Sequence, residues 1–400
     1  MNTFFTELGR TVLRRWKAER FDLARFPAIA QAALDERPPT THVDVAAFVR
    51  EFLLNDEQAL QTQSGFGQPE IVAYYHPKFY VQVLFWMDGT TDIHQHAFSG
   101  AFHVLAGSSI HARYALANAE AINPHFYVGD VRMQSIELLA TGRTEPIVAG
   151  DGFVHALFHL ETPSITVVVR THHDGPEIAP QLNYLPPHVA LDPALHDPLM
   201  ARRAQLLDVL EELQDPTYVE MVLAMIAELD FARGFAVLQH GMRHLRNVDA
   251  WELVLAAFQA KHGRSADGIP ATLDEIARRA AIVDLRSTIT EPEHRFFLAL
   301  LMNVRTRADL LALVAERFPE QPPLATVLRW ADELCETTEF GTALLDAEFP
   351  ETQPDFVLAA LRHFVQGGKK LPAALRTLGA AGVADRRTIF ARSSLAILLT

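Results

Sequence analysis

The sequence of 400 residues predicts an α+β multidomain fold, in which a β-barrel follows N-terminal helices and precedes a C-terminal all-α helical domain. Three changes of pattern along the chain support this class. Apolar residues first recur at helical spacing, then β-branched and aromatic runs alternate with turns, and finally Ala, Leu, Glu and Arg fill long windows. We therefore expect four regions: a helical segment at 1–64, the barrel at 65–174, a Pro-rich bridge at 175–199 and the all-α domain at 200–400.

The helical spacing of the first region is clearest in two groups of apolar residues. Phe21, Leu23 and Phe26 form one group, and residues between 45 and 53 form the other. Short connections favour neighbouring positions, so these helices are expected to cover the barrel rather than join the C-terminal domain.

The barrel region contains runs that are typical of strands. FYVQVLFW, GAFHVLAG and PSITVVVR are rich in β-branched and aromatic residues, and DGTT, AGSS and AGDG separate such runs. Prolines then punctuate the bridge and resist both helix and central strand. The later windows, such as MARRAQLLDVLEELQ and DLLALVAERF, favour helix, and no strand is predicted beyond the bridge.

The amino-acid composition argues against several classes of function. Lys and Arg total 35 against 49 Asp and Glu, a net charge of −14, which argues against a nucleic-acid or anionic-membrane binder and favours a small-molecule partner. The single cysteine, Cys335, excludes an internal disulfide framework and indicates a reducing, cytoplasmic location. No signal-peptide pattern and no window of 18 uncharged apolar residues are found, so no membrane span is predicted.

The chemical signal lies in the histidines of the strand region. In a strand, residues two apart face the same way, so His94 and His96 can direct both imidazoles at one ion. His155 is the candidate third ligand, at the start of another expected strand where Gly152 allows a tight entry. Three neutral nitrogen donors leave coordination positions open, which a catalytic site needs. The sequence therefore predicts a metal site at these three histidines.

The residues around these histidines resemble the two motifs of the cupin superfamily. The first motif consists of a glycine, His-x-His and a spaced glycine, and it matches Gly89, His94, His96 and Gly107. The second motif, Gly-x-x-His, matches Gly152 and His155. The resemblance implies a cupin-type β-barrel. The position of the usual glutamate falls near Gly100 or Ala101, so the implied centre has three histidines and no carboxylate.

Within the cupins, the local similarity is to the cysteine dioxygenase-like group, over about a quarter of the chain. It is carried by PKFYVQVLFW, IHQH and GFVHALFHLETPSITVVVR. That group uses a three-histidine Fe(II) centre to activate O2. The resemblance implies a mononuclear non-haem iron oxygenase of dioxygenase type that oxidises a small organic molecule, with another divalent metal left open.

The chain departs from that group at three features. The substrate-carboxylate arginine would fall near Glu70, the crosslinking cysteine is absent, and the Ser-His-Tyr relay becomes Thr166, Val168 and Arg170. These departures predict a different substrate and poor oxidation of cysteine.

Further polar residues are candidates for roles around the metal. His159 shares a strand face with His155, and Arg170 shares one with Val168 and could clamp an anionic substrate. Catalytic residues beyond the ligands are otherwise unknown from the sequence. His103 and His111 are expected to be surface or supporting residues, and Tyr80 and Gln82 share one face that could supply polar groups to a pocket.

The sequence leaves other functions open. One alternative is a non-catalytic cupin that binds a ligand or metal and signals through a helical interaction domain. Another is a zinc or manganese isomerase or hydrolase on the same ligands, because three histidines do not select one metal. The helical domain could bind a protein partner or a second copy of the chain. Nucleotide-binding and serine-hydrolase motifs are absent from the sequence.

Overall fold

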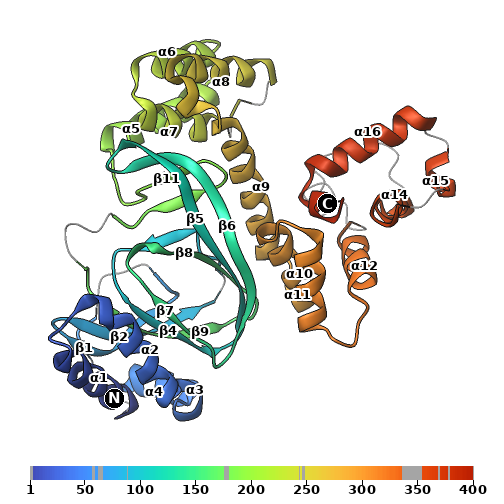
Figure 1. The fold of residues 1–400 in the computed structure, drawn as a ribbon. Helices are drawn as coiled ribbons and strands as arrows, with labels where there is room; N and C mark the ends of the chain where they lie inside the picture. The colour runs from blue at the N-terminus through green and yellow to red at the C-terminus, as the bar shows by residue number, and fades with distance from the viewer. Residues whose placement is uncertain are drawn as a thin grey trace.

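A central barrel carries helices on three sides (Figure 1). The computed structural model describes residues 3–55, 59–61, 66–87, 89–174, 180–242, 244–245, 248–335, 354–367, 370–376 and 379–399. The expected boundary at 64/65 lies outside the described residues.

The N-terminal helices cover one face of the barrel, as expected from the short connections. They are α1 (Thr3–Ala18), α2 (Phe26–Glu36), α3 (Pro39–His42) and α4 (Val45–Leu54). Their buried side chains, among them Phe5, Trp16 and Phe26, pack with Phe79 and other apolar residues of the sheet below. This layer shields the outer face of the sheet from water.

Eleven strands are described, and they form two sheets. The bounds are β1 (Glu70–His76), β2 (Phe79–Trp86), β3 (His94–His96), β4 (Gly100–Ala106), β5 (Ser108–Asn123), β6 (Phe126–Ala140), β7 (Thr144–Ile147), β8 (Gly150–His159), β9 (Ser164–Thr171), β10 (Asn183–Leu185) and β11 (Val189–Leu191). One sheet has the order β1-β2-β9-β4-β7, and the other closes on itself in the order β10-β11-β6-β5-β8-β3. The runs interpreted as strands from the sequence correspond to β2, β4 and β9.

The Pro-rich bridge differs from its prediction, because it contributes two strands to the barrel. In β10, Asn183 pairs with His94 of β3, and in β11, Val189 pairs with Val128 of β6. Each strand has only three residues between proline-containing turns. Such short strands have no readable alternation, and tertiary pairing with distant strands decides their conformation.

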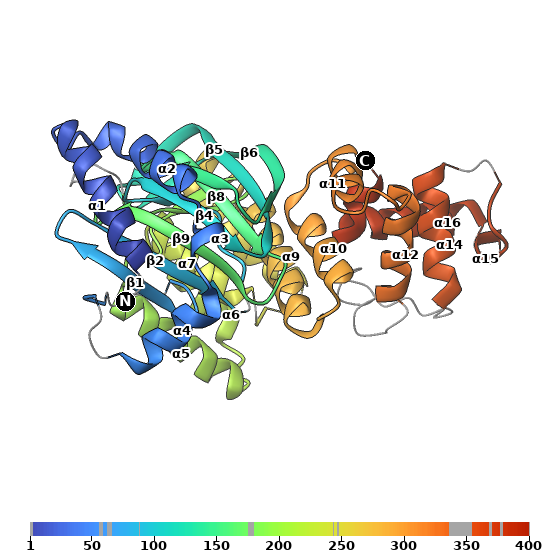
Figure 2. The same cartoon turned by 90° about the horizontal axis from the view of Figure 1, so that it is seen from below.

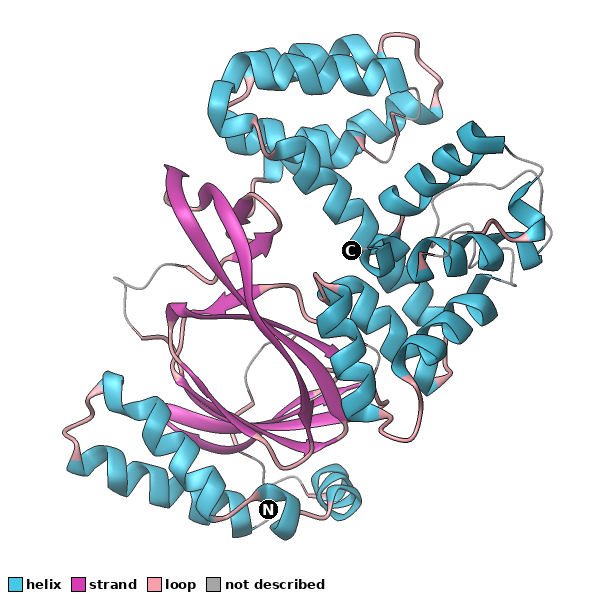
Figure 3. Ribbon diagram, turned by 45° about the vertical axis from the view of Figure 1, so that its right-hand side comes forward, coloured by secondary structure: helices cyan, strands magenta, loops and turns pink. Residues whose placement is uncertain are grey.

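After the bridge, every regular element of the described chain is helical. The helices are α5 (Pro198–Glu212), α6 (Tyr218–Glu228), α7 (Phe231–Gly241), α8 (Val248–His262), α9 (Ile269–Thr288), α10 (Pro292–Asn303), α11 (Arg307–Arg317), α12 (Pro323–Cys335), α14 (Pro354–Gln366), α15 (Ala373–Arg376) and α16 (Gly379–Arg392). We call α5–α8 the first lobe, and α10–α12 with α14–α16 the second lobe; α9 runs from one to the other (Figures 1 and 2). The predicted α+β fold class, a β-barrel between N-terminal helices and C-terminal helices, is confirmed (Figure 3).

Both lobes share apolar cores with the barrel. Phe126 and Val189 of the barrel pack with the first lobe. Ile110, Phe158 and Leu160 pack with the second lobe. None of the described helices is long and apolar enough to span a membrane.

Candidate metal centre

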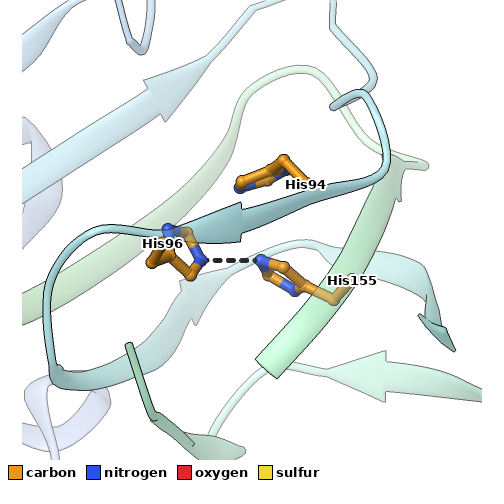
Figure 4. Close-up of side chains that lie close together, drawn as sticks. All are labelled: His94, His96 and His155. Carbon is orange, nitrogen blue, oxygen red and sulfur yellow. Dashed lines mark hydrogen bonds between the residues drawn. The ribbon is translucent and has the colours of Figure 1, made fainter. Parts of the chain in front are cut away.

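Strand pairing brings the three predicted ligands together. His94 and His96 lie on β3, and His94 is the direct antiparallel partner of His155 on β8. A register irregularity follows His94, so that His96 pairs with Gly150. The three imidazoles consequently point toward one another, as Figure 4 shows.

The distances between the ring nitrogens suit a shared ion. His96 Nε2 and His155 Nε2 are 3.0 Å apart, and one nitrogen from each of the three rings falls within a 4.8 Å group. Two nitrogens that each lie about 2.1 Å from one ion at right angles are about 3.0 Å apart. The donor set therefore fits a transition metal.

Hydrogen bonds orient the rings for coordination. His94 Nδ1 lies 2.8 Å from the carbonyl oxygen of Asp92, which can only accept, so Nδ1 donates its proton and Nε2 keeps a free lone pair. His94 Nε2 is buried and has no hydrogen-bond partner. An orphaned buried nitrogen of this kind is what an ion would satisfy.

A chain of side chains supports His155 from behind. His155 Nδ1 lies 3.1 Å from His111 Nε2, and His111 Nδ1 lies 3.2 Å from Glu137 Oε1. A carboxylate at the end of such a chain fixes tautomers and raises the basicity of the coordinating nitrogen. His111 thus has the supporting position expected for it, whereas His103 contacts Thr144 instead.

Burial keeps the three candidate ligand rings neutral. Each of the three side chains is at most 4% exposed. Burial lowers the pKa of His94, and burial together with neighbouring histidines lowers the pKa of His96 and His155 well below the ordinary value. Neutral imidazole is the form that binds metal, so all three rings are ready to coordinate at neutral pH.

Backbone packing excludes a carboxylate ligand at Gly100, one of the two positions to which the resemblance assigns it. A Cβ built on Gly100 would lie 2.1 Å from the carbonyl oxygen of Val169 on the neighbouring strand. No side chain fits there, so a glutamate at this position is sterically excluded. At the second motif, Gly150 rather than Gly152 takes the left-handed conformation, with φ of +74°. The tight entry predicted at Gly152 therefore begins two residues earlier.

A small cavity of about 40 Å³ adjoins the three histidines inside the barrel. Its other walls are mostly apolar: Phe66, Leu84, Trp86, Phe98, Phe102, Ile147, Leu157 and Val168, with Gln82, Thr91 and Thr166 as the polar members. Gln82 Oε1 is buried and has no hydrogen-bond partner. The face of β2 that carries Gln82 is therefore the inner one, which the sequence could not decide.

An outer hollow of about 340 Å³ meets this cavity. Phe66, Trp86, Thr91 and His94 line both spaces. The Phe66 and Trp86 rings meet edge to face, with centroids 5.2 Å apart. The outer walls are more polar and include Gln68, Thr90, Asp92, Gln181 and Asn183. This arrangement gives the ligand site a route to the surface past two aromatic rings.

The two further candidates lie on the inner strands but make different contacts. The His159 ring stacks on Trp86, with centroids 4.7 Å apart, and its Nδ1 lies 3.0 Å from Ser109 Oγ. The Arg170 guanidinium lies 3.3 Å from the centre of the Phe98 ring, and it donates to two backbone carbonyl oxygens. Arg170 is not among the residues that line either space. Its role as an anion clamp stays a prediction.

Sequence reasoning missed several residues of the site. Glu137, Phe66 and Trp86 lie outside the motifs, and Phe98 lies inside the first motif at a position that the motif does not specify. The alternation of polar and apolar residues along FYVQVLFW was the available signal for Trp86, which shares a face with Gln82.

Comparison with known proteins shows likeness to solved structures over part of the chain. No protein-family model matches, and no curated protein matches. The similar structures include TT1209 from Thermus thermophilus, with 16% identity over 28% of this chain and 90% of that one and a TM-score of 0.20.

Two further matches carry descriptive names. A cupin-2 domain containing protein from Shewanella frigidimarina has 13% identity over 31% of this chain and 92% of that one, with a TM-score of 0.19. Hydroquinone 1,2-dioxygenase from Sphingomonas sp. TTNP3 has 11% identity over 27% of this chain and 68% of that one, with a TM-score of 0.21. All three matches cover less than a third of this chain.

Proposed function

We propose that the protein is a metal-dependent oxygenase of dioxygenase type, which binds Fe(II) and oxidises a small organic molecule with O2. The observation that carries the proposal is the convergence of three buried neutral imidazoles on one point beside an apolar cavity. In a dioxygenase reaction both oxygen atoms enter the product and the substrate supplies the electrons, so no further reductant is needed.

His94, His96 and His155 would hold the metal. Imidazole ligands suit iron among other first-row metals, and iron is the choice that the cupin-like motifs favour. When bound, Fe(II) supplies the redox chemistry that brings O2 and an organic substrate to reaction. The chain's contribution is to fix the three rings, and the contacts from Asp92 and His111 perform that task.

The walls of the two spaces favour a neutral substrate. Among the described residues lining them there is no Lys or Arg, so no cationic side chain there pairs with a carboxylate. Gln82 Oε1, buried without a partner, can accept a hydrogen bond from a hydroxyl or amino group. Phe66 and Trp86 lie between the outer hollow and the metal site, where they limit the entry of water.

Oxygen uptake by the iron-loaded protein tests this function. Neutral molecules with a hydroxyl or amino group should drive uptake, and cysteine, which brings a carboxylate, should be a poor substrate. A Gln82→Met variant keeps the volume of the side chain and removes the acceptor, so KM for the best substrate should rise about tenfold. The His155→Ala variant should show no uptake.

Two outcomes would redirect the proposal. Full iron occupancy without uptake for any neutral substrate would favour the alternative of a non-catalytic ligand-binding module. Efficient uptake with cysteine would contradict the substrate class inferred from the uncharged walls.

A further inference from the structure

A second group of potential metal ligands lies in the first lobe. Asp208 comes from α5, His240 from the end of α7, and His244 from the turn that follows α7. One ligand atom from each of these residues falls within a 4.8 Å group. The group is independent of the barrel histidines in both sequence and fold.

Both imidazoles approach the same carboxylate oxygen. His240 Nε2 lies 2.8 Å from Asp208 Oδ1, and His244 Nε2 lies 2.9 Å from that atom. The spacing of four residues places the two rings on one side of a helical turn, with centroids 5.2 Å apart. Two nitrogens and one oxygen thus converge from α5, the end of α7 and the turn that follows it.

Hydrogen bonds from neutral imidazoles to the carboxylates do not account for this convergence. His240 Nε2 is buried and makes no hydrogen bond of acceptable geometry, despite its 2.8 Å approach to Asp208. His244 has a carboxylate at each ring nitrogen, because Glu211 Oε2 lies 3.3 Å from Nδ1. The imidazolium form of His244 would donate to both carboxylates, but a neutral imidazole carries one N–H, so one of its nitrogens then directs a lone pair at a carboxylate oxygen. A cation between the two atoms removes that repulsion.

The surroundings of the cluster also favour a cation. The Tyr218 ring lies 6.5 Å from that of His244, and its hydroxyl is buried without a hydrogen-bond partner. Burial raises the pKa of Tyr218, and the charges of Glu211 and Asp208 add to that rise. The carboxylates therefore create a negative potential where the imidazoles converge.

We propose that Asp208, His240 and His244 bind a divalent transition-metal ion of the Zn²⁺ class. Two imidazole nitrogens and a carboxylate oxygen form a ligand set typical of such ions, and Glu211 would orient His244 from behind. The two imidazole side chains are 17% and 21% exposed, so ions reach the site from solvent. His240 also lines a groove of about 570 Å³ between α5, α7 and α9, which leaves room for water at the remaining positions.

The ion would link α5 to α7. Both helices belong to the apolar core that the first lobe shares with Phe126 and Val189 of the barrel. Binding therefore stabilises the lobe against which one end of the barrel packs, and it does so without any contact to the barrel histidines.

Titration of the metal-free full-length protein with Zn²⁺, followed by calorimetry, tests the proposal. His155→Ala removes a ligand from the barrel centre and should leave one Zn²⁺ bound in the first lobe. Adding His240→Ala to that variant should abolish binding, and adding Asp208→Asn should weaken it at least tenfold. His125→Ala is the matched control, because His125 pairs with Asp192 at 2.8 Å within a histidine–aspartate pair that belongs to neither metal group. Added to His155→Ala, it should leave binding unchanged.

The result that would overturn the proposal is an absence of Zn²⁺ binding to His155→Ala at tens of micromolar, with circular dichroism showing an intact fold. Binding that persists at full strength after both His240→Ala and Asp208→Asn would contradict the ligand assignment. Because the barrel ligand is already removed, failure of the barrel centre and failure of the lobe site give different results.

Discussion

His159 lies four residues beyond His155 on β8, but its ring contacts other side chains and does not belong to the group of three candidate metal ligands. Its ring stacks on Trp86, and its Nδ1 faces Ser109. Burial, with a smaller contribution from the charge of Arg286, lowers the pKa of His159 to about 3. The ring is therefore neutral in the folded protein over a wide range of pH.

This lowered pKa predicts how His159 affects stability. Because the unfolded imidazole titrates near pH 6.5 and the folded one near 3, the unfolded state binds the extra proton between these values. Folding is therefore weakened as the pH falls below about 6.5. When the pH falls from 7.5 to 5.5, protonation of His159 in the unfolded state should lower the free energy of unfolding by about 1.4 kcal/mol.

Urea denaturation of the metal-free protein at these two pH values measures the loss. The His159→Gln variant should show a pH-dependent loss that is smaller than that of the wild type by about 1.4 kcal/mol. The same loss in both proteins would mean that His159 is protonated or solvated in the folded state.

At the scale of elements, strand pairing positions the ligands, and glycines permit that pairing. Gly100 on β4 pairs with Arg170 on β9, and the nearby carbonyl oxygen of Val169 leaves no room for a side chain at Gly100. The sequence motif marks a glycine region near the histidines but does not show which glycine the packing requires.

Gly100→Ala should destabilise the protein by at least about 2 kcal/mol, because its Cβ would overlap backbone and force two paired strands apart. Thermal unfolding measures this effect. Gly89→Ala is the control, since a Cβ there would meet its nearest neighbours at 3.7 Å, an ordinary contact distance. Equal melting temperatures for Gly100→Ala and the wild type would contradict the described packing of β4 on β9.

The extent of sequence-based prediction differs between these elements. The convergence of His94, His96 and His155 could be predicted because a strand's period of two and the spaced glycines are local features. Tyr184 and its neighbours in β10 and β11 could not, because three-residue strands depend on partners far away in sequence. Glu137 was missed for the same reason, since its contact with His111 exists only through pairing of β5 with β6.

For the whole molecule, the structure describes helical lobes that share cores with the barrel rather than a detached helical domain. Phe158 on the outer side of β8 packs into the core of the second lobe, and Phe126 on β6 packs into that of the first. Polar contacts add to the second interface, where Arg317 pairs with Glu161 at 2.9 Å and Arg286 donates to the His159 carbonyl oxygen.

Hydrogen exchange tests whether each lobe is coupled to its own side of the barrel. Phe158→Ala removes a fully buried ring and should cost about 3–5 kcal/mol, with faster exchange in both β8 and α10. Phe126→Ala, the matched change at the other interface, should instead speed exchange in α7, where Phe231 and Phe235 meet its ring. Unchanged exchange in α10 after Phe158→Ala would contradict the shared core.

The central claim is that His94, His96 and His155 hold one metal ion in the barrel. Elemental analysis after anaerobic reconstitution with Fe(II) and desalting tests it most directly. The His240→Ala background removes the proposed second site from the count, and His103→Gln is the control for loss of a barrel histidine. One iron per chain is predicted for the His240→Ala protein and for the same protein with His103→Gln. Adding His94→Ala or His155→Ala to the His240→Ala protein should reduce the iron content to less than a tenth of that. The assignment would be contradicted if the proteins that carry His94→Ala or His155→Ala retained as much iron as the His240→Ala protein.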